Sequence, residues 1–151
     1  MCKPEHVGTF LVGSLDTDHV QAEVQRRAYP DTEPEWLEVE IDISAGPFAA
    51  RYRALWRAGF LPRFRRQVEA LYQTLEGIAV LEPDWERSLT LTLSGDGLGH
   101  VRVSGEASAD CGPRGATLTF TLPEIDQTYL PPLIEQLKGI EAQFPTTSGV
   151  P

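Results

Sequence analysis

The sequence has few of the residues from which small proteins build covalent or metal cross-links. It contains two cysteines among 151 residues, Cys2 and Cys111. Two cysteines are too few for a disulfide framework, so we expect free thiols. The three histidines, His6, His19 and His100, share no metal-ligand spacing with one another or with a cysteine. The sequence therefore predicts no metal site and no cofactor.

Long apolar runs are also missing. Each hydrophobic segment is short and interrupted by charge, so none suits a membrane span. The start, MCKPEHVGTF, lacks the basic and apolar regions of a signal peptide, which leads us to expect a cytoplasmic protein. With 41% hydrophobic residues, residues 1–145 are long enough for a single α+β domain with its own core. The small and polar residues 146–151 are expected to form a flexible tail.

Positive charge is scarce and unevenly distributed. The chain has 13 basic and 22 acidic residues, for a formal net charge of -9. Residues 1–48 and 82–151 are acidic, whereas residues 49–81 hold 6 bases and 2 acids. Non-specific nucleic-acid binding depends on neutralising phosphates, so this balance argues against it. It favours solubility and rapid association with a basic partner.

The segment EPEWLEVEIDIS, residues 33–44, has the alternation of a β-strand. Side chains of a strand alternate between its two faces, so one face is apolar and the other acidic. The apolar set is Leu37, Val39, Ile41 and Ile43, and the polar set is Trp36, Glu38, Glu40 and Asp42. We call Glu38, Glu40 and Asp42 the acidic stripe. Like charges on one strand face repel, and Arg51 and Arg53 on the next strand are candidate partners that would offset this repulsion.

The remaining patterns predict more strands and two helices. Alternation predicts strands at 9–15, 19–29, 46–56, 77–83, 88–94, 100–107 and 117–122, with the polar second one as an edge strand. Apolar residues at helical spacing predict a helix from Pro62 to Glu76, with Gly77 as its C-terminal cap. A second helix is predicted after Asp126 or Thr128 as N-cap, with its two prolines in the first turn.

These elements predict an α+β fold: a largely antiparallel twisted sheet of about six to eight strands with two helices packed on one face. The other face is expected to be open and polar. It would carry Glu38, Glu40, Asp42, Thr90, Thr92, Arg102, Thr117, Thr119 and Thr121.

Catalytic patterns are weak. GDGLGH, residues 95–100, precedes a strand rather than a helix, so it indicates a hairpin loop and not a phosphate cradle. Glu38 and Glu40 on an open strand are hydrated, and nothing there raises either pKa toward a value useful for acid–base catalysis. No Ser-His-Asp or Cys-His arrangement is indicated. We therefore expect a protein that is not an enzyme.

The order of several segments resembles the bacterial WapI-type immunity proteins and their uncharacterised relatives. The segments are EWLEVEIDI, GPFAARYRALW, FRRQVEALYQTLEGIAVLEP, LTLTLSGDGLGHVRVSGEA and LTFTLPEIDQTYLPPLIEQL, and the resemblance covers residues 9–145. It implies a cytoplasmic protein that binds and neutralises the toxic domain of a polymorphic contact-dependent toxin encoded beside it.

The acidic stripe and its neighbours are the candidate partner-binding residues. The set is Glu33, Glu35, Trp36, Glu38, Glu40 and Asp42. Toxin domains that cut nucleic acids are commonly basic, so carboxylates would steer the encounter. Trp36 would be the anchor, because aromatic residues dominate binding hot spots. The alternative is structural: Trp36 packs at the sheet end, and Arg51 and Arg53 neutralise the stripe.

Three other functions stay open. A small-ligand or regulatory protein-binding module would have a pocket between sheet and helices. An enzyme of unrecognised type would first direct attention to His100, Asp126 and Tyr129, although Asp126 also suits a helix cap. A basic patch for a nucleic acid or an acidic protein would draw on Trp56, Arg57, Arg63, Arg65, Arg66 and Trp85. The oligomeric state is not specified by any of these patterns.

Overall fold

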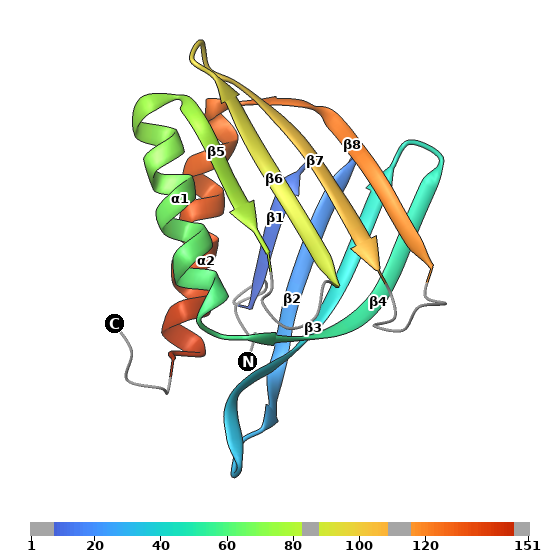
Figure 1. The fold of residues 1–151 in the computed structure, drawn as a ribbon, viewed down its shortest axis with the longest axis vertical. Coiled ribbons are helices and arrows are strands. Elements are labelled where there is room, and N and C mark those ends of the chain that lie inside the picture. The colour runs from blue at the N-terminus through green and yellow to red at the C-terminus, as the bar shows by residue number, and fades with distance from the viewer. Residues whose placement is uncertain (1–7, 83–87, 109–115, 147–151) are drawn as a thin grey trace, which may run out of the picture.

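The computed structural model describes residues 8–82, 88–108 and 116–146. Within these ranges, eight strands form two antiparallel sheets of four strands each, accompanied by two α-helices (Figure 1). The predicted α+β class is confirmed. Cys2, Trp85 and Cys111, and the predicted tail beyond residue 146, lie outside the described residues.

Each sheet is built from strands in sequence order. The first sheet comprises β1 (Thr9–Gly13), β2 (His19–Tyr29), β3 (Glu33–Ala45) and β4 (Phe48–Arg57). The second sheet comprises β5 (Glu76–Leu81), β6 (Leu89–Asp96), β7 (His100–Ser108) and β8 (Thr117–Asp126). The predicted hairpin through Ala45, Gly46 and Pro47 is confirmed, and so is the loop of GDGLGH between β6 and β7.

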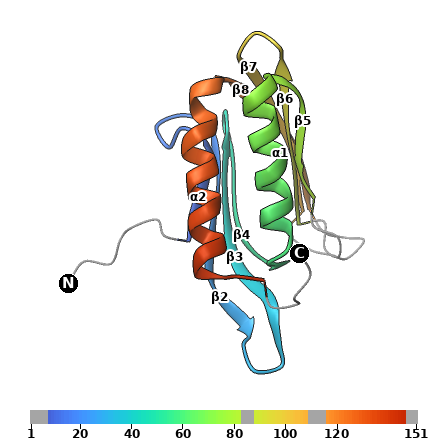
Figure 2. The same cartoon turned by 90° about the vertical axis from the view of Figure 1, so that its left-hand side faces the viewer.

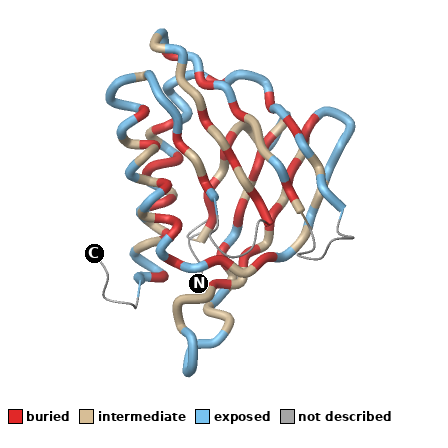
Figure 3. The backbone as a smooth tube through the Cα atoms, in the orientation of Figure 1, coloured by how far each residue is buried: buried red, intermediate tan, exposed pale blue. Residues whose placement is uncertain are grey.

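The two sheets face each other across one hydrophobic core (Figures 1 and 3). The strands thus divide between two sheets instead of forming the one sheet expected. Alternating residues of both sheets supply the core, such as Leu37 and Ile41 from β3 and Leu91 and Leu93 from β6. The predicted open face is therefore split. Glu38, Glu40 and Asp42 lie on the outer face of the first sheet, and Arg102 and the threonines lie on the outer face of the second.

The helices close one side of this sandwich. Helix α1 (Phe60–Thr74) lies beside β5, helix α2 (Leu130–Gln143) lies beside β1, and the helices pack against each other (Figure 2). The predicted apolar faces are confirmed, because each buries its row of core residues. These rows are Leu61, Phe64, Val68 and Leu71 in α1, and Leu130, Leu133, Ile134, Leu137 and Ile140 in α2.

The helix ends differ in part from the prediction. Helix α1 ends earlier than expected because Leu75 adopts a left-handed conformation, with φ of 63°, and its N–H donates to the Leu71 carbonyl at 2.7 Å. The expectation that Gly77 caps this helix is wrong, since Gly77 lies within β5. Asp126 caps a short 3-10 turn, η1 (Gln127–Tyr129), that leads into α2. The N-cap of α2 itself is Tyr129, so the expectation that Asp126 or Thr128 caps this helix directly is wrong. The prolines fall in the first turn of α2, as predicted.

The prediction of β2 as an edge strand is also wrong. Strand β2 lies between β1 and β3. Val20, Ala22 and Val24 alternate into the core, so its inner face is as apolar as that of β3. Its polar residues lie on the outer face or in the far part of the hairpin, where β2 and β3 extend beyond the body of the molecule and the tip is exposed (Figures 1 and 3).

No helix within the described ranges is long and apolar enough to cross a membrane.

Candidate functional site

The acidic stripe lies on the outer face of the first sheet, where neighbouring strands supply arginines. Glu38 is within reach of two of them: Arg26 Nη1 lies 3.0 Å from its Oε1, and Arg53 Nη1 lies 3.8 Å away. Arg51 Nη2 donates to Asp42 Oδ2 at 2.9 Å, and this hydrogen bond is the main cause of the raised pKa of Arg51. The expected cross-strand pairing with Arg51 and Arg53 is therefore confirmed.

Acids and bases are balanced on this outer face. Its described charged residues are the acids Glu23, Glu38, Glu40 and Asp42 and the bases Arg26, Arg51, Arg53 and Arg57. Basic side chains thus lie between and beside the carboxylates of the acidic stripe, and the outer face as a whole is not an unbroken acidic surface. Exposed ion pairs contribute about 0–1 kcal/mol each, so these pairs mainly offset the repulsion between carboxylates.

Glu40 is the least compensated carboxylate of the stripe. It lies directly opposite Glu23 of β2 on one side and Arg53 of β4 on the other. Among the described residues its ion pair is with Arg51, whose Nε lies 3.9 Å from Glu40 Oε1. Glu23 Oε1 accepts a neutral hydrogen bond from Gln25 Nε2 at 3.0 Å. Like charges directly opposite on two strands destabilise a sheet. A partner's cation at this place would relieve that repulsion.

A shallow hollow of about 180 Å³ surrounds this pair of glutamates. Its lining residues are Gln21, Glu23, Glu40, Asp42 and Arg51. Sequence reasoning missed Gln21 and Glu23, because β2 was expected at an edge and its register with β3 was not assigned. The alternation of His19, Gln21 and Glu23 against Val20, Ala22 and Val24 was the available signal.

His19 lies at one end of this outer face and is buried. Its Nδ1 lies 3.3 Å from the Thr17 carbonyl oxygen, which can only accept, so Nδ1 carries the hydrogen. Its Nε2 has no hydrogen-bond partner among the described residues and lies 3.7 Å from Asp42 Oδ1.

The other candidate residues lie toward the tip of the β2–β3 hairpin. Glu33 is exposed, and Glu35 and Trp36 are half-buried. The guanidinium of Arg57 stacks over the Trp36 ring, with Cζ 5.1 Å from the ring centroid. This contact covers part of the ring and leaves the rest accessible. The hairpin tip adds Tyr29, 46% exposed, which pairs with Glu33 across the two strands.

The residues considered for catalysis lie at another end of the molecule. His100 and Asp126 are cross-strand neighbours on β7 and β8, but both are exposed. His100 Nδ1 lies 2.9 Å from Asp96 Oδ2, and this hydrogen bond is the main cause of the raised pKa of His100. Asp126 accepts from the backbone and side chain of Thr128, which lowers its pKa. These contacts fix a loop and a cap.

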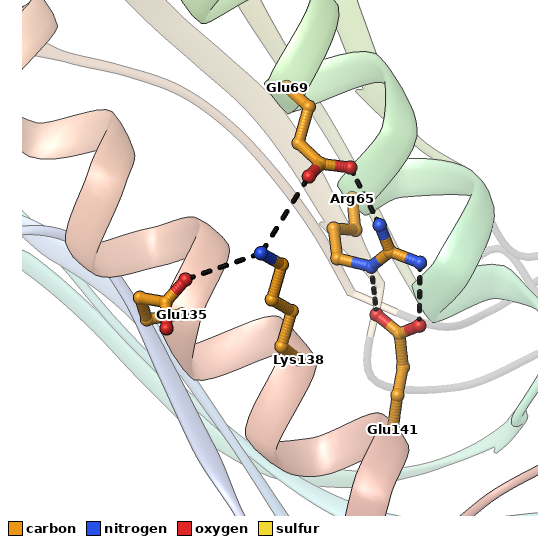
Figure 4. Close-up of polar contacts among 5 residues, drawn as sticks. All are labelled: Arg65, Glu69, Glu135, Lys138 and Glu141. Atoms are coloured by element: carbon orange, nitrogen blue, oxygen red, sulfur yellow. Dashed lines mark hydrogen bonds and ion pairs between the residues drawn. The ribbon is translucent and has the colours of Figure 1, made fainter.

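The arginines considered for a basic patch are divided among several contacts. Trp56 is fully buried, so it offers no surface for stacking. Arg65 forms a two-pronged ion pair with Glu141 of α2, through Nε at 2.6 Å and Nη2 at 3.0 Å, and also bonds Glu69 at 2.6 Å (Figure 4). Arg63 stacks over Phe60. Arg65 therefore ties the two helices together.

Two further hollows lie on the surface of the described residues. One of about 250 Å³ lies between α1 and α2, lined by Glu69, Tyr72, Gln73, Pro131, Ile134 and Glu135. A larger one of about 500 Å³ lies between the β3–β4 turn and β8. The first hollow is formed by helices and the second by strands and turns, so neither lies between a sheet and the helices. In the described ranges, no group of three or more His, Cys, Asp or Glu residues is placed to hold a metal ion.

Comparison with known proteins identifies one family. The model of the immunity protein WapI-like family matches residues 10–145, nearly the whole chain. No curated protein matches the sequence. The matched range begins within β1 and ends just after α2, so it includes both sheets and both helices. The chain therefore belongs to the WapI-like immunity protein family.

Proposed function

We propose that this protein is a non-enzymatic cytoplasmic immunity protein of a bacterium, which binds a basic toxin domain and suppresses its activity. Family membership supports a toxin-neutralising role in general. The finer statement, that the toxin domain is basic and meets an acidic surface, draws support from the net charge of -9.

The proposed interface is the outer face of the first sheet with the adjoining hairpin. Its residues are Glu33, Glu35, Trp36, Glu38, Glu40 and Asp42, as inferred from the sequence. The observation that best supports it is the opposed pair Glu23 and Glu40, in which, among the described residues, Arg51 compensates Glu40 only at 3.9 Å. A Lys or Arg side chain in the hollow beside this pair would gain two carboxylate contacts and remove their repulsion.

The remaining residues have distinct proposed roles. Glu33 is exposed near the end of a projecting hairpin, so it would meet a partner early and steer the encounter. Trp36 would be an aromatic anchor, with its accessible part against the partner and Arg57 behind it. Glu38 and Asp42 are bound to arginines, so they would contribute by exchanging these internal partners for external ones.

Charge reversal tests this interface. The toxin domain encoded beside the gene is purified, and its binding to the wild-type protein is measured together with rescue of growth in cells that express the toxin. We expect Glu33→Lys combined with Glu40→Lys to lower the association rate by about tenfold at low salt, with a smaller effect at high salt.

The matched control is Glu76→Lys with Glu82→Lys. Both residues are exposed, at the start of β5 and just after its end, away from the acidic stripe and from β8, and the pair changes the net charge by the same amount. If both pairs of substitutions lower the association rate equally, the net charge alone acts and the assignment of this face is wrong. If the toxin domain does not bind the wild-type protein and growth is not rescued, the immunity role itself is refuted.

A further inference from the structure

The four outermost strands of the two sheets differ in how their free edges are protected. The edges belong to β1 and β4 in the first sheet and to β5 and β8 in the second. An edge strand presents unpaired backbone N–H and C=O groups, which invite pairing with another chain. Natural proteins protect such edges by covering them or by placing charges on them.

Helices cover two of these edges and also satisfy backbone groups on them. The Gln136 side chain of α2 accepts the N–H of Leu11 on β1 at 2.9 Å. The Gln67 side chain of α1 accepts the N–H of Val80 on β5 at 2.8 Å. These glutamines take the place of a further strand, and Figure 2 shows the helices lying along this side of both sheets.

The third edge, β4, is protected by charge. Arg51, Arg53 and Arg57 project from it and are all exposed. Basic side chains on an edge strand disfavour pairing with a further strand.

Within the described ranges, no helix covers the fourth edge, β8, and its first six residues carry no charge. Thr117–Leu122 reads TLTFTL and contains no charge and no proline. The threonines at 117, 119 and 121 are not buried, and among the described residues β7 is the strand with which β8 pairs. Threonine, leucine and phenylalanine in alternation suit an extended strand. Protection begins after this segment, with Pro123 and a bulge at residues 123–124, where the register with β7 shifts.

An apolar groove lies beside the same segment. It has a volume of about 500 Å³ and is lined by Asp18, by the turn from Ala45 to Phe48, and by residues 118–123. Phe48 is 61% exposed at this groove, an unusual position for a large aromatic side chain. Strand addition needs both elements found here: a free edge for backbone hydrogen bonds and an adjacent pocket for alternate side chains.

The charge of the groove favours a basic partner over a second copy of the chain. Asp18 is the charged residue of the lining, and Glu124 and Asp126 follow on β8. Two copies would each bring a net charge of -9 to the same contact. A basic domain would instead gain from these charges.

We propose that an extended segment of the basic toxin domain adds to the second sheet as a fifth strand along Thr117–Leu122. Its alternate apolar side chains would enter the groove against Phe48, and a basic side chain would lie near Asp18. This inference rests on the proposed function for the identity of the partner, but it concerns a different surface from the acidic stripe.

Hydrogen exchange of the backbone amides gives the direct test. In the complex with the toxin domain encoded beside the gene, we expect the alternate amides of residues 117–122 that point away from β7 to exchange at least about tenfold more slowly, because strand addition places these N–H groups in new hydrogen bonds. Docking through side chains elsewhere would leave these amides unchanged. Unchanged exchange at 117–122 in a complex that forms would refute the strand addition and leave the immunity role intact.

Substitutions in the groove give a second readout. Phe48→Lys places a positive charge in the groove. Thr119→Lys places one on the edge strand, opposite Glu106 of β7, which can form an ion pair with the new lysine. We expect each to weaken toxin binding by roughly tenfold or more. Ile78→Lys is the matched control, because Ile78 is 60% exposed on β5 and the charge change is the same. Equal effects of Phe48→Lys and Ile78→Lys would overturn the proposal.

The isolated protein distinguishes a second copy from a toxin segment. The protein alone is studied by sedimentation, with and without Phe48→Lys. We expect that no dimer forms through the edge of β8, so the substitution should not change the oligomeric state. A dimer with protected 117–122 amides that dissociates in this variant would assign the edge to self-association and refute the proposed occupant. Failure of the wild-type protein to bind the toxin domain at all would instead count against the proposed function.

Discussion

Ser88→Ala tests how much a buried hydrogen bond between the two sheets contributes to the free energy of unfolding. Trp56 of β4 is fully buried, and its Nε1 donates to Ser88 Oγ at 3.0 Å. The Ser88 carbonyl accepts from the Tyr52 hydroxyl at 2.5 Å and from the Ser108 N–H at 2.9 Å. Burial raises the pKa of Tyr52, so its hydroxyl stays protonated and donates. Ser88 precedes β6, and the contact thus links one sheet to the other.

The expected cost follows from what the substitution removes. Alanine retains the backbone carbonyl, so the bonds from Tyr52 and Ser108 remain, and one oxygen atom leaves almost no cavity. The Trp56 N–H loses its acceptor while it stays buried, and an unsatisfied buried donor costs about 1–3 kcal/mol. We therefore expect Ser88→Ala to lower the free energy of unfolding by about 2 kcal/mol, which corresponds to roughly 4–8 °C in the unfolding midpoint for a chain of this length.

Urea unfolding followed by far-UV circular dichroism measures this change, and a double-mutant cycle isolates its cause. In the Trp56→Phe background the indole donor is absent, so Ser88→Ala should cost about 0.5 kcal/mol or less. Ser94→Ala is the control for the chemical change itself, at a half-exposed serine of β6. An equal cost of Ser88→Ala in the wild-type protein and in the Trp56→Phe background would refute the assigned hydrogen bond as the source of stability.

Three further predictions concern the helices and the β6–β7 loop. Glu141→Gln breaks the two-pronged pair with Arg65, in which both side chains are 20% exposed, and should cost about 1 kcal/mol in urea unfolding. Glu135→Gln removes a pair with Lys138 in which the glutamate is 74% and the lysine 52% exposed, so it should cost about 0–0.5 kcal/mol. Equal costs of the two substitutions would contradict the reasoning. Gly95→Ala places a Cβ 2.4 Å from the Leu75 carbonyl oxygen and 2.8 Å from Leu71 Cδ1, so it should destabilise by about 1–3 kcal/mol, whereas Gly59→Ala, with nothing within 4 Å, should be nearly neutral. Asp96 raises the pKa of His100 through their hydrogen bond, so this contact stabilises the fold below the ordinary His pKa of 6.5 and the stabilisation is lost as pH rises through the raised value. Hydrogen bonding from the Leu98 N–H lowers the pKa of Asp96, so its own contribution is present above its ordinary value of 3.8 and is lost as pH falls through the lowered one. An NMR titration of His100 that is unchanged in Asp96→Asn would contradict the assignment for His100, and an Asp96 carboxyl in the wild-type protein that titrates at its ordinary value would contradict the assignment for Asp96.

Local patterns predicted the elements of this fold better than their assembly. Period-two alternation located β3, β4, β6, β7 and β8, and helical spacing located α1 and α2. The same alternation arises whether a strand's apolar face meets a helix or another sheet, so it did not distinguish one sheet from two. The end of α1 was missed because Leu75, a residue seldom left-handed, adopts the conformation expected of a glycine.

The candidate site shows the same division between local and non-local information. Alternation placed Glu38, Glu40 and Asp42 on one face, and proximity in the hairpin correctly suggested Arg51 and Arg53 as neighbours. The register of β2 with β3 shifts twice, between Val24 and Arg26 and between Arg27 and Tyr29. The sequence therefore did not indicate that Glu23 opposes Glu40 or that Arg26 reaches Glu38. The sequence also did not indicate that β8 is an edge strand, because this depends on which strands lie beside it in space.

The two proposed surfaces are expected to affect different rate constants of toxin binding. The outer face carries equal numbers of described acids and bases, so the net charge of -9 arises mainly from other parts of the chain. Association is governed by net charge together with the charges at the place where the two proteins first meet, whereas backbone pairing and apolar contacts are lost during dissociation. We therefore expect Glu33→Lys with Glu40→Lys to lower the association rate most, and Phe48→Lys to raise the dissociation rate beyond its Ile78→Lys control. If Phe48→Lys changes only the association rate, the groove acts through charge alone and backbone pairing at β8 contributes nothing to the lifetime of the complex.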